Sequence, residues 1–428
     1  MPSLVEDLEF RGLVADAAGA GLQDALGRGG MTAYIGFDPT SSSLHVGNLV
    51  VVLMLRRLQL HGHRPIAVAG GATAMIGDPG GKSEERPLLS EEEVKANVAG
   101  VRAQLDRLLD APSSGDAHSA PLVLDNREWL GGLGLLGFLR DVGKHFTVNQ
   151  MLAKESVRAR VERPEHGISF TEFSYMLLQA LDYLHLFDEY GCRLQMGGSD
   201  QWGNITAGID FVRRARQQEV YGLVTPLLVK ADGTKFGKTE SGTVWLDPDR
   251  TSPYELYQFL FRTDDKLVGE CLRYLTFIDH DRITDLDRAT AQHPERREAQ
   301  RALADSVCSL VHGDAETDRA RRAAAALYDG HIESLDEPLL LQVFAEAPRS
   351  TWARAELDGD GPSLVDALAR SGLVRSKSEA RGLIAQGGAY VNGKRVRDID
   401  ARLGRDELLF DRYVVLQKGR DYHLVRFE

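Results

Sequence analysis

The sequence lacks the features that would mark a secreted protein, a membrane protein or a protein stabilised by a structural metal. It has three cysteines in 428 residues, and because they lie far apart without metal-ligand spacing, we expect reduced thiols. The longest apolar run, residues 49–55, is too short to cross a bilayer. Residues 1–8 are acidic and lack the basic and apolar segments of a signal peptide. We therefore expect a cytoplasmic protein without membrane contact and without a protein-ligated structural metal.

Positive charge is also scarce. The net charge is −12, which argues against indiscriminate nucleic-acid binding and against a DNA partner. Residues 363–428 differ, with 13 Lys and Arg against 9 Asp and Glu, or +4, while the rest has 38 against 54, or −16. The C-terminal part is therefore the one that could meet a polyanion. The length and the hydrophobic content of 43% are those of a globular protein with two or three domains.

The residues near the N-terminus predict a βαβ unit. Residues 31–37 and 64–71 read as buried strands, and residues 49–58 between them as a buried helix. This order favours a parallel sheet covered by helices, with ligands bound at the carboxyl ends of its strands. The polar loop before the helix contains Pro39 and a Ser/Thr run, which suit the first turn of a helix and an anion. Further helices are predicted at 91–110 and 170–187, and strands at 192–196 and 223–229.

The second half of the chain changes character. Residues 252–328 have a helical pattern almost throughout, and the stretch 358–362 has linker chemistry. Ser363 and Ser376 are predicted to open two short helices with capping boxes, and Asn392-Gly393 to turn a hairpin over 389–396. The expected domains are a Rossmann-like α/β domain at 1–230, a mobile loop at 231–250, an α-helical domain at 251–345, a linker at 346–362 and a small α+β domain at 363–428.

Four stretches could carry chemistry. Residues 77–83 and 232–239 resemble a P-loop, but each has three residues before Gly-Lys where that motif needs four, so a P-loop NTPase is disfavoured. They are either solvated turns or cations on glycine-rich loops, which suit phosphates. Residues 197–204 are either a tight turn or a site in which Asp200 holds a ribose. Tyr175, Gln179 and Asp182 share one helix face, which meets either a polar ligand or solvent.

Taken together, these motifs resemble a known family. His45-Val46-Gly47-Asn48 is similar to the His-Ile-Gly-His signature of class I aminoacyl-tRNA synthetases. Residues 235–239 are similar to their second signature in the form found in bacterial tyrosyl-tRNA synthetases, and residues 36–40, 70–73 and 197–204 also match, as does the 175/179/182 set. The likeness covers essentially the whole chain, and residues 363–428 resemble the S-four-type RNA-binding domain of these enzymes.

The resemblance implies a ligase that activates L-tyrosine with ATP to tyrosyl-adenylate and then transfers tyrosine to the terminal adenosine of tRNA(Tyr). ATP would be a substrate, with Mg²⁺ on its phosphates. The helical domain would be the anticodon-binding domain, or else a packing domain with little RNA contact. A homodimer formed through the catalytic domain is also implied.

The resemblance assigns site residues one by one. The tyrosine pocket would consist of Tyr34 and Asp182 for the phenol, Asp78, Tyr175 and Gln179 for the ammonium group, and Asn126 and Gln201. Adenosine would contact Gly36, Asp38, Gly47, Gly198 and Asp200, and Asn48 would belong to the ATP site. The phosphates would contact Thr40, His45, Lys82, Arg86, Lys235, Lys238 and Thr239. RNA would contact Arg375, Lys377, Arg381, Lys394, Arg395 and Arg397.

One residue departs from the family pattern, and other functions compete. Asn48 replaces the second signature histidine; it can donate a hydrogen bond but cannot carry a positive charge. A synthetase-derived RNA-binding protein without chemistry is one alternative, and an adenylyltransferase acting on a small acid is another. Tyr34, Asp182 and the C-terminal module argue against tryptophanyl-tRNA synthetase.

Overall fold

The computed structural model describes residues 2–80, 89–109, 120–162, 167–230, 233–239, 242–345, 347–419 and 421–428. They form two compact units, one of residues 1–251 and 263–307, the other of residues 252–262 and 308–428. No helix in these described ranges is both long and apolar enough to span a membrane.

A six-stranded sheet organises the first unit, in the order β1-β6-β5-β2-β3-β4. Its strands are β1 (Asp16–Ala18), β2 (Thr32–Phe37), β3 (Arg64–Ala69), β4 (Leu122–Asp125), β5 (Cys192–Gly198) and β6 (Tyr221–Thr225). The strands β2 to β6 run parallel, and β1 pairs antiparallel with β6. The predicted parallel sheet is thus confirmed. Strand β6 ends at Thr225 rather than 229, because Pro226 has no N–H to donate to the ladder.

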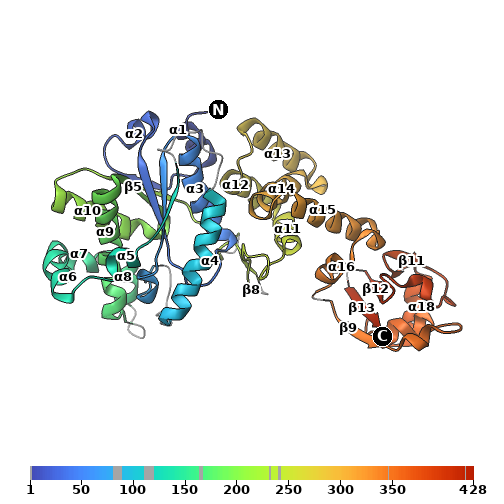
Figure 1. The fold of residues 1–428 in the computed structure, drawn as a ribbon. Coiled ribbons are helices and arrows are strands. Elements are labelled where there is room, and N and C mark those ends of the chain that lie inside the picture. The colour runs from blue at the N-terminus through green and yellow to red at the C-terminus, as the bar shows by residue number, and fades with distance from the viewer. Residues whose placement is uncertain are drawn as a thin grey trace. The chain divides into compact units, whose positions relative to one another are not determined.

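Helices cover both faces of this sheet, with α9 and α10 on one side and α3 and α4 on the other (Figure 1). The helices of the first unit are α1 (Leu4–Arg11), α2 (Leu22–Arg28), α3 (Leu49–Leu60), α4 (Glu91–Leu109), α5 (Arg127–Leu130), α6 (Leu135–Asp141), α7 (Val148–Leu152), α8 (Glu155–Val161), α9 (Phe170–Tyr190), α10 (Trp202–Arg216), α12 (Asp265–Leu275) and α13 (His280–Gln292). Helix α14 (Glu298–His312) has residues in both units. Burial on both faces explains why β2 and β3 read as nearly continuous apolar runs.

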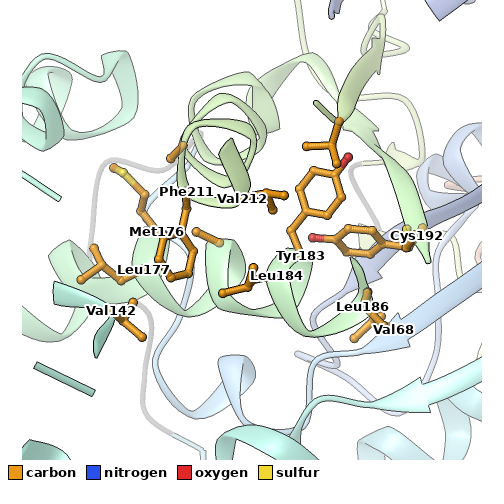
Figure 2. Packing of buried hydrophobic residues seen from close by; sticks show 14 of the residues in the cluster. Val68, Val142, Met176, Leu177, Tyr183, Leu184, Leu186, Cys192, Phe211 and Val212 are labelled. Carbon is orange, nitrogen blue, oxygen red and sulfur yellow. The ribbon is translucent and has the colours of Figure 1, made fainter. Parts of the chain in front are cut away.

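A buried cluster fixes α9 against the sheet, as Figure 2 shows around Tyr183 and Phe211. The Tyr183 hydroxyl lies 2.8 and 2.7 Å from the carbonyl oxygens of Arg193 and Tyr221 and donates its one proton to this pair of acceptors, so this buried polar group is satisfied. The rings of Tyr183 and Tyr34 meet edge to face with centroids 5.4 Å apart. Helix α9 is therefore fixed beside β2, and this orients Tyr175, Gln179 and Asp182.

The strand order places a switch point between β2 and β5. From β2 the chain continues to β3 and β4 on one side, whereas β5 continues to β6 on the other. In open parallel sheets the crevice outside the carboxyl ends of two such strands is where ligands bind. Residues 38–48 follow β2, and residues 199–204, which include the start of α10, follow β5.

The second unit combines helices with a second sheet. Its helices are α11 (Pro253–Phe261), α15 (Asp314–Asp329), α16 (Glu337–Val343), α17 (Leu364–Arg370) and α18 (Lys377–Ala385). Its sheet has the order β11-β10-β12-β13-β9, with β9 (Arg349–Trp352), β10 (Ala389–Val391), β11 (Lys394–Val396), β12 (Tyr413–Lys418) and β13 (Asp421–Phe427). The range expected to be a linker thus contains β9, which pairs parallel with β13.

The hairpin and both helix starts predicted for this unit are confirmed, but neither predicted capping box is complete: Ser363 and Ser376 accept from the backbone N–H three residues on, without the reciprocal bond. Asn392 and Gly393 have φ of 49° and 80°, which is the type I′ turn expected of Asn-Gly. Ser363 and Ser376 cap α17 and α18. At Ser376 the reciprocal bond is missing because the Glu379 carboxylate accepts from the backbone N–H of Arg375 instead of that of Ser376.

Candidate active site

A cavity of about 330 Å³ opens at the switch point. It lies where β2, β5 and α9 meet residues 38–48, Lys235, Phe236 and Trp245. Sixteen predicted site residues line it: Tyr34, Gly36, Asp38, Thr40, His45, Gly47, Asn48, Asp78, Asn126, Tyr175, Gln179, Asp182, Gly198, Asp200, Gln201 and Lys235. Lys238 is not among the lining residues. Lys82 and Arg86 lie outside the described residues, and of Thr239 only the backbone is described.

The loop after β2 differs from its prediction. Residues 38–45 are irregular, and the helix begins with a 3₁₀ turn, η1 (Val46–Asn48), that leads into α3, so Pro39 does not start it. The side chain of Asn48 is held by the loop itself, because its Oδ1 accepts from the backbone N–H of His45 at 2.9 Å, and both residues line the cavity. A short side-chain acceptor competes well for a nearby backbone donor, and this was not visible in the spacing.

The two signature segments lie against each other. Val46 donates its N–H to the Val244 carbonyl at 3.0 Å, and Leu246 donates to Leu44 at 2.9 Å. A Cβ on Gly237, whose φ is +91°, would be 2.4 Å from Val46 Cγ1, and one on Gly47 would be 3.3 Å from the Phe236 carbonyl oxygen. Glycine at both positions therefore allows the backbones to approach closely. The second signature ends in β7 (Lys238–Thr239), which pairs antiparallel with β8 (Gly242–Thr243).

His45 is uncharged at neutral pH. Burial lowers its pKa from 6.5 to about 4, and the nearby positive charges of Lys235 and Lys238 act in the same direction. A neutral imidazole can donate or accept one hydrogen bond, so His45 can contact a phosphate oxygen without adding charge.

The closed end of the cavity is formed around Asp182. Asn126 Nδ2 and Trp129 Nε1 donate to its two carboxylate oxygens, at 3.0 and 2.7 Å. Burial raises the pKa of Asp182 to about 7, against the effect of these two hydrogen bonds. Trp129 was missed by the sequence reasoning, because an isolated tryptophan 53 positions before Asp182 gives no sign that the two meet.

Two buried polar atoms beside Asp182 lack partners within the described residues. They are the hydroxyl oxygen of Tyr34, a residue only 2% exposed, and Gln179 Oε1. The pKa of Tyr34 is raised well above 10 by burial and by the negative charge of Asp182. Because buried polar atoms are normally satisfied, this end of the cavity is suited to a ligand with its own polar groups.

The middle of the cavity contains two carboxylates, those of Asp38 and Asp78, that accept hydrogen bonds from neighbouring side chains. Tyr175 OH and Thr73 Oγ1 both donate to Asp38, each at 2.7 Å, and Gln201 Nε2 donates to Asp78 at 2.6 Å. At the open end Lys235 Nζ lies 3.6 Å from Asp200, and half of the Lys235 side chain is exposed. The arrangement therefore changes from buried acceptors at one end to exposed charges at the other. No group of three possible metal ligands occurs in the part of the chain that is described.

Comparison with known proteins agrees with this geometry. A family model described as tRNA synthetases class I (W and Y) matches residues 28–329. The chain belongs to this synthetase family. A second model, for the C-terminal domain of tyrosine–tRNA ligases, matches residues 340–425 of this class I synthetase.

Full-length relatives carry the same assignment. The tyrosine–tRNA ligase of Roseiflexus castenholzii is 53% identical over 427 residues, covering 100% of each chain. That of Bacillus caldotenax is 48% identical over 99% of each chain. Among solved structures, a C-terminally truncated mitochondrial tyrosyl-tRNA synthetase of Aspergillus nidulans matches with a TM-score of 0.68 and 34% identity, over 76% of this synthetase and 94% of that chain.

Proposed function

We propose that this synthetase is a tyrosine–tRNA ligase whose cavity binds tyrosine at the Asp182 end and ATP at the Lys235 end. The ligase activity follows from the family and from relatives of about 50% identity over the full chain. The observation that carries the proposal is the closed end of the cavity, where an acceptor carboxylate lies beside a tyrosine hydroxyl that has no hydrogen-bond partner among the described residues.

In this proposal the substrate phenol donates to Asp182 and accepts from Tyr34. Phenylalanine would leave both groups buried and unpaired, which is the costly case for a polar site. The ammonium group of the substrate lies among Asp78, Tyr175 and Gln179. The Gln179 Oε1 atom, to which no described residue donates, supplies an acceptor there. Asn126 and Gln201 orient the carboxylates of Asp182 and Asp78, because they donate hydrogen bonds to them.

Adenosine occupies the space beside the small residues Gly36, Gly47 and Gly198, and Asp38 and Asp200 accept from its polar groups. The tyrosine carboxylate attacks the α-phosphorus, and pyrophosphate departs as the bond to the β-phosphate breaks. No strong base is needed, so the site works by positioning and by stabilising the phosphate charge. Mg²⁺ would enter with the ATP phosphates. We assign the stabilisation of the phosphate charge to the following residues: Thr40, His45, Lys82, Arg86, Lys235, Lys238 and Thr239.

Transfer to tRNA would involve basic side chains of the C-terminal module. The proposed contacts on α18 and the β10–β11 region are Arg375, Lys377, Arg381, Lys394, Arg395 and Arg397. Lys377 pairs with Asp366 and Lys394 with Glu333, but both lysines remain well exposed, at 64% and 72%, and can exchange these partners for phosphates.

Replacing Lys377, Arg381 and Arg397 by alanine tests these contacts. The triple variant should charge tRNA more weakly and with a smaller dependence on salt, while adenylate formation stays unchanged. Unchanged charging would contradict the assignment.

We also propose a homodimer formed through the first unit. Several large apolar side chains around α6 and α7 are exposed: Leu133, Leu135, Leu136, Leu139, Val148 and Leu152. Leu136 is 81% exposed, and clustered apolar residues of this kind mark interaction surfaces. Sedimentation of Leu136→Asp should give a smaller species than the parent protein; an unchanged species would place the interface elsewhere. The cytoplasm, where tRNA is charged, remains the proposed location.

Exchange of labelled pyrophosphate into ATP tests the activation step. It should depend on tyrosine and be absent with phenylalanine or tryptophan. Exchange driven by another acid would favour the adenylyltransferase alternative, and no exchange by the folded protein would favour an RNA-binding protein without chemistry.

A further inference from the structure

Residues 245–251 follow the second signature and contact the loop of the first signature at several points. Trp245 forms an antiparallel bridge with His45, and the Asp247 N–H donates to Ser43 Oγ at 3.2 Å. The Trp245 N–H donates to Thr251 Oγ1 at 3.0 Å. This segment is therefore built onto the loop that lines the phosphate end of the cavity.

Arg250 contacts both this segment and the first-signature loop. Its guanidinium carbon lies 3.5 Å from the centroid of the Trp245 ring, and its Nη1 donates to Ser41 Oγ. Both Ser41 and Trp245 line the cavity. A planar guanidinium can stack on an indole face and donate in its own plane at the same time, which a lysine ammonium cannot do.

These contacts bear on the position of the catalytic lysines. Val244, next to Trp245, donates to the Gly237 carbonyl at 2.9 Å and accepts from Val46. Gly237 lies between Lys235 and Lys238, so the chain around Trp245 supports the backbone on which both lysines are carried. The Lys235 side chain forms a loose ion pair with Asp200, at 3.6 Å.

We propose that Trp245 and Arg250 are positioning residues for the ATP half of the reaction. Through Ser41 they hold the segment that carries Lys235 and Lys238 against the first-signature loop. The inference rests on the proposed function for one point, the assignment of the ATP phosphates to these lysines. Neither residue is assigned a contact with tyrosine.

Pyrophosphate exchange in a double-mutant cycle tests the pairing. Arg250→Ala and Trp245→Leu should each lower kcat/KM for ATP about 10-fold, the size expected from losing a stacked cation and one charged hydrogen bond. KM for tyrosine should change less than about 2-fold. The double variant should be no worse than either single variant, because both remove the same interaction. Additive losses, or equal losses for tyrosine, would overturn the proposal.

Conservative variants separate positioning from direct phosphate binding. Trp245→Phe keeps an aromatic face and should recover most of the ATP kinetics. Arg250→Lys keeps the charge but not the flat stack, so it should behave like Arg250→Ala. Wild-type kinetics in Arg250→Lys would instead make Arg250 a point-charge partner of the phosphates. Arg288→Ala, which removes an exposed arginine paired one turn away on α13, is the matched control and should be neutral.

Limited proteolysis does not depend on catalysis, so it tests the positioning role separately from the proposed function. Trypsin should cleave after Lys235 and Lys238 faster in Arg250→Ala than in the parent protein or in Arg288→Ala, at equal thermal midpoints. Equal cleavage rates would overturn the positioning role. If the parent protein showed no exchange, the proposed function would fail, while this cleavage comparison would still test the contact.

Discussion

The two ends of the cavity are built in opposite ways. At the phenol end, Asp182 is 4% exposed, and its two oxygens already accept from groups on a different element. At the phosphate end, the Lys235 side chain is 52% exposed and its carboxylate partner 26%. Choice among amino acids needs buried groups that are costly to leave unpaired, whereas phosphate binding needs charge that can move. We expect the two ends to respond differently to substitution, pH and salt.

The largest effect should follow from Asp182→Ala. It removes a buried acceptor and leaves the donors of Asn126 and Trp129 unpaired, so kcat/KM for tyrosine should fall by about 10²–10³. Tyrosyl-tRNA synthetases as a class are known to reject phenylalanine by a factor of about 10⁵, and the variant should lose most of this discrimination. Binding of ATP alone should be unchanged. Asp188→Ala, on the same helix but paired with Arg216 at the surface, is the control. Equal losses for both substrates would refute the phenol assignment.

Lys235→Ala should affect the other end. Loss of a charge that stabilises departing pyrophosphate should lower kcat about 10²-fold, with KM for tyrosine unchanged. Exchange kinetics at varied ATP and tyrosine would measure both. A rise in KM for tyrosine instead would show that the two ends are not separable.

Acid should weaken tyrosine binding before it affects ATP binding. Because the pKa of Asp182 is raised to about 7, the carboxyl gains a proton as the pH falls below 7 and no longer accepts from the phenol as a carboxylate. The Kd for tyrosine should rise about 10-fold from pH 8 to pH 6, following a single ionisation. Equilibrium titrations of tyrosine and ATP at each pH would check this. His45, with a pKa of about 4, should not contribute over this range. A flat profile for tyrosine would contradict the raised pKa.

The smallest effect should be that of Trp129→Phe. It removes one of the two donors to Asp182, so tyrosine binding at pH 8 should weaken several-fold. The pKa of Asp182 should rise further, because a hydrogen bond that favours the carboxylate is lost. The midpoint of the tyrosine pH profile should therefore move to higher pH. Weaker binding with an unmoved midpoint would indicate a packing effect alone.

Local order along the chain was predictable, because hydrophobic periodicity and turn chemistry act over a few residues. The strand at 32–37, the helix at 49–60, the Asn392-Gly393 hairpin and the parallel sheet were all visible in this way. The candidate site residues were named through motif resemblance, without knowledge of distances. Sixteen of them line the cavity at the switch point. Strand β9 was not visible, since the strand it pairs with, β13, is about seventy residues away and a four-residue strand has no periodicity to read.

What the sequence alone determined is therefore the types of side chain, the order of elements and the family. The tertiary structure alone decided which side chains meet. It turned Asn48 back onto His45, brought Trp129 to Asp182, and stacked Arg250 on Trp245 beside Ser41. Each of these contacts depends on how separate elements pack, and packing across the chain leaves little trace in residue spacing. The properties that distinguish the two ends of the cavity, burial and the pKa of Asp182, arise only once the chain has folded.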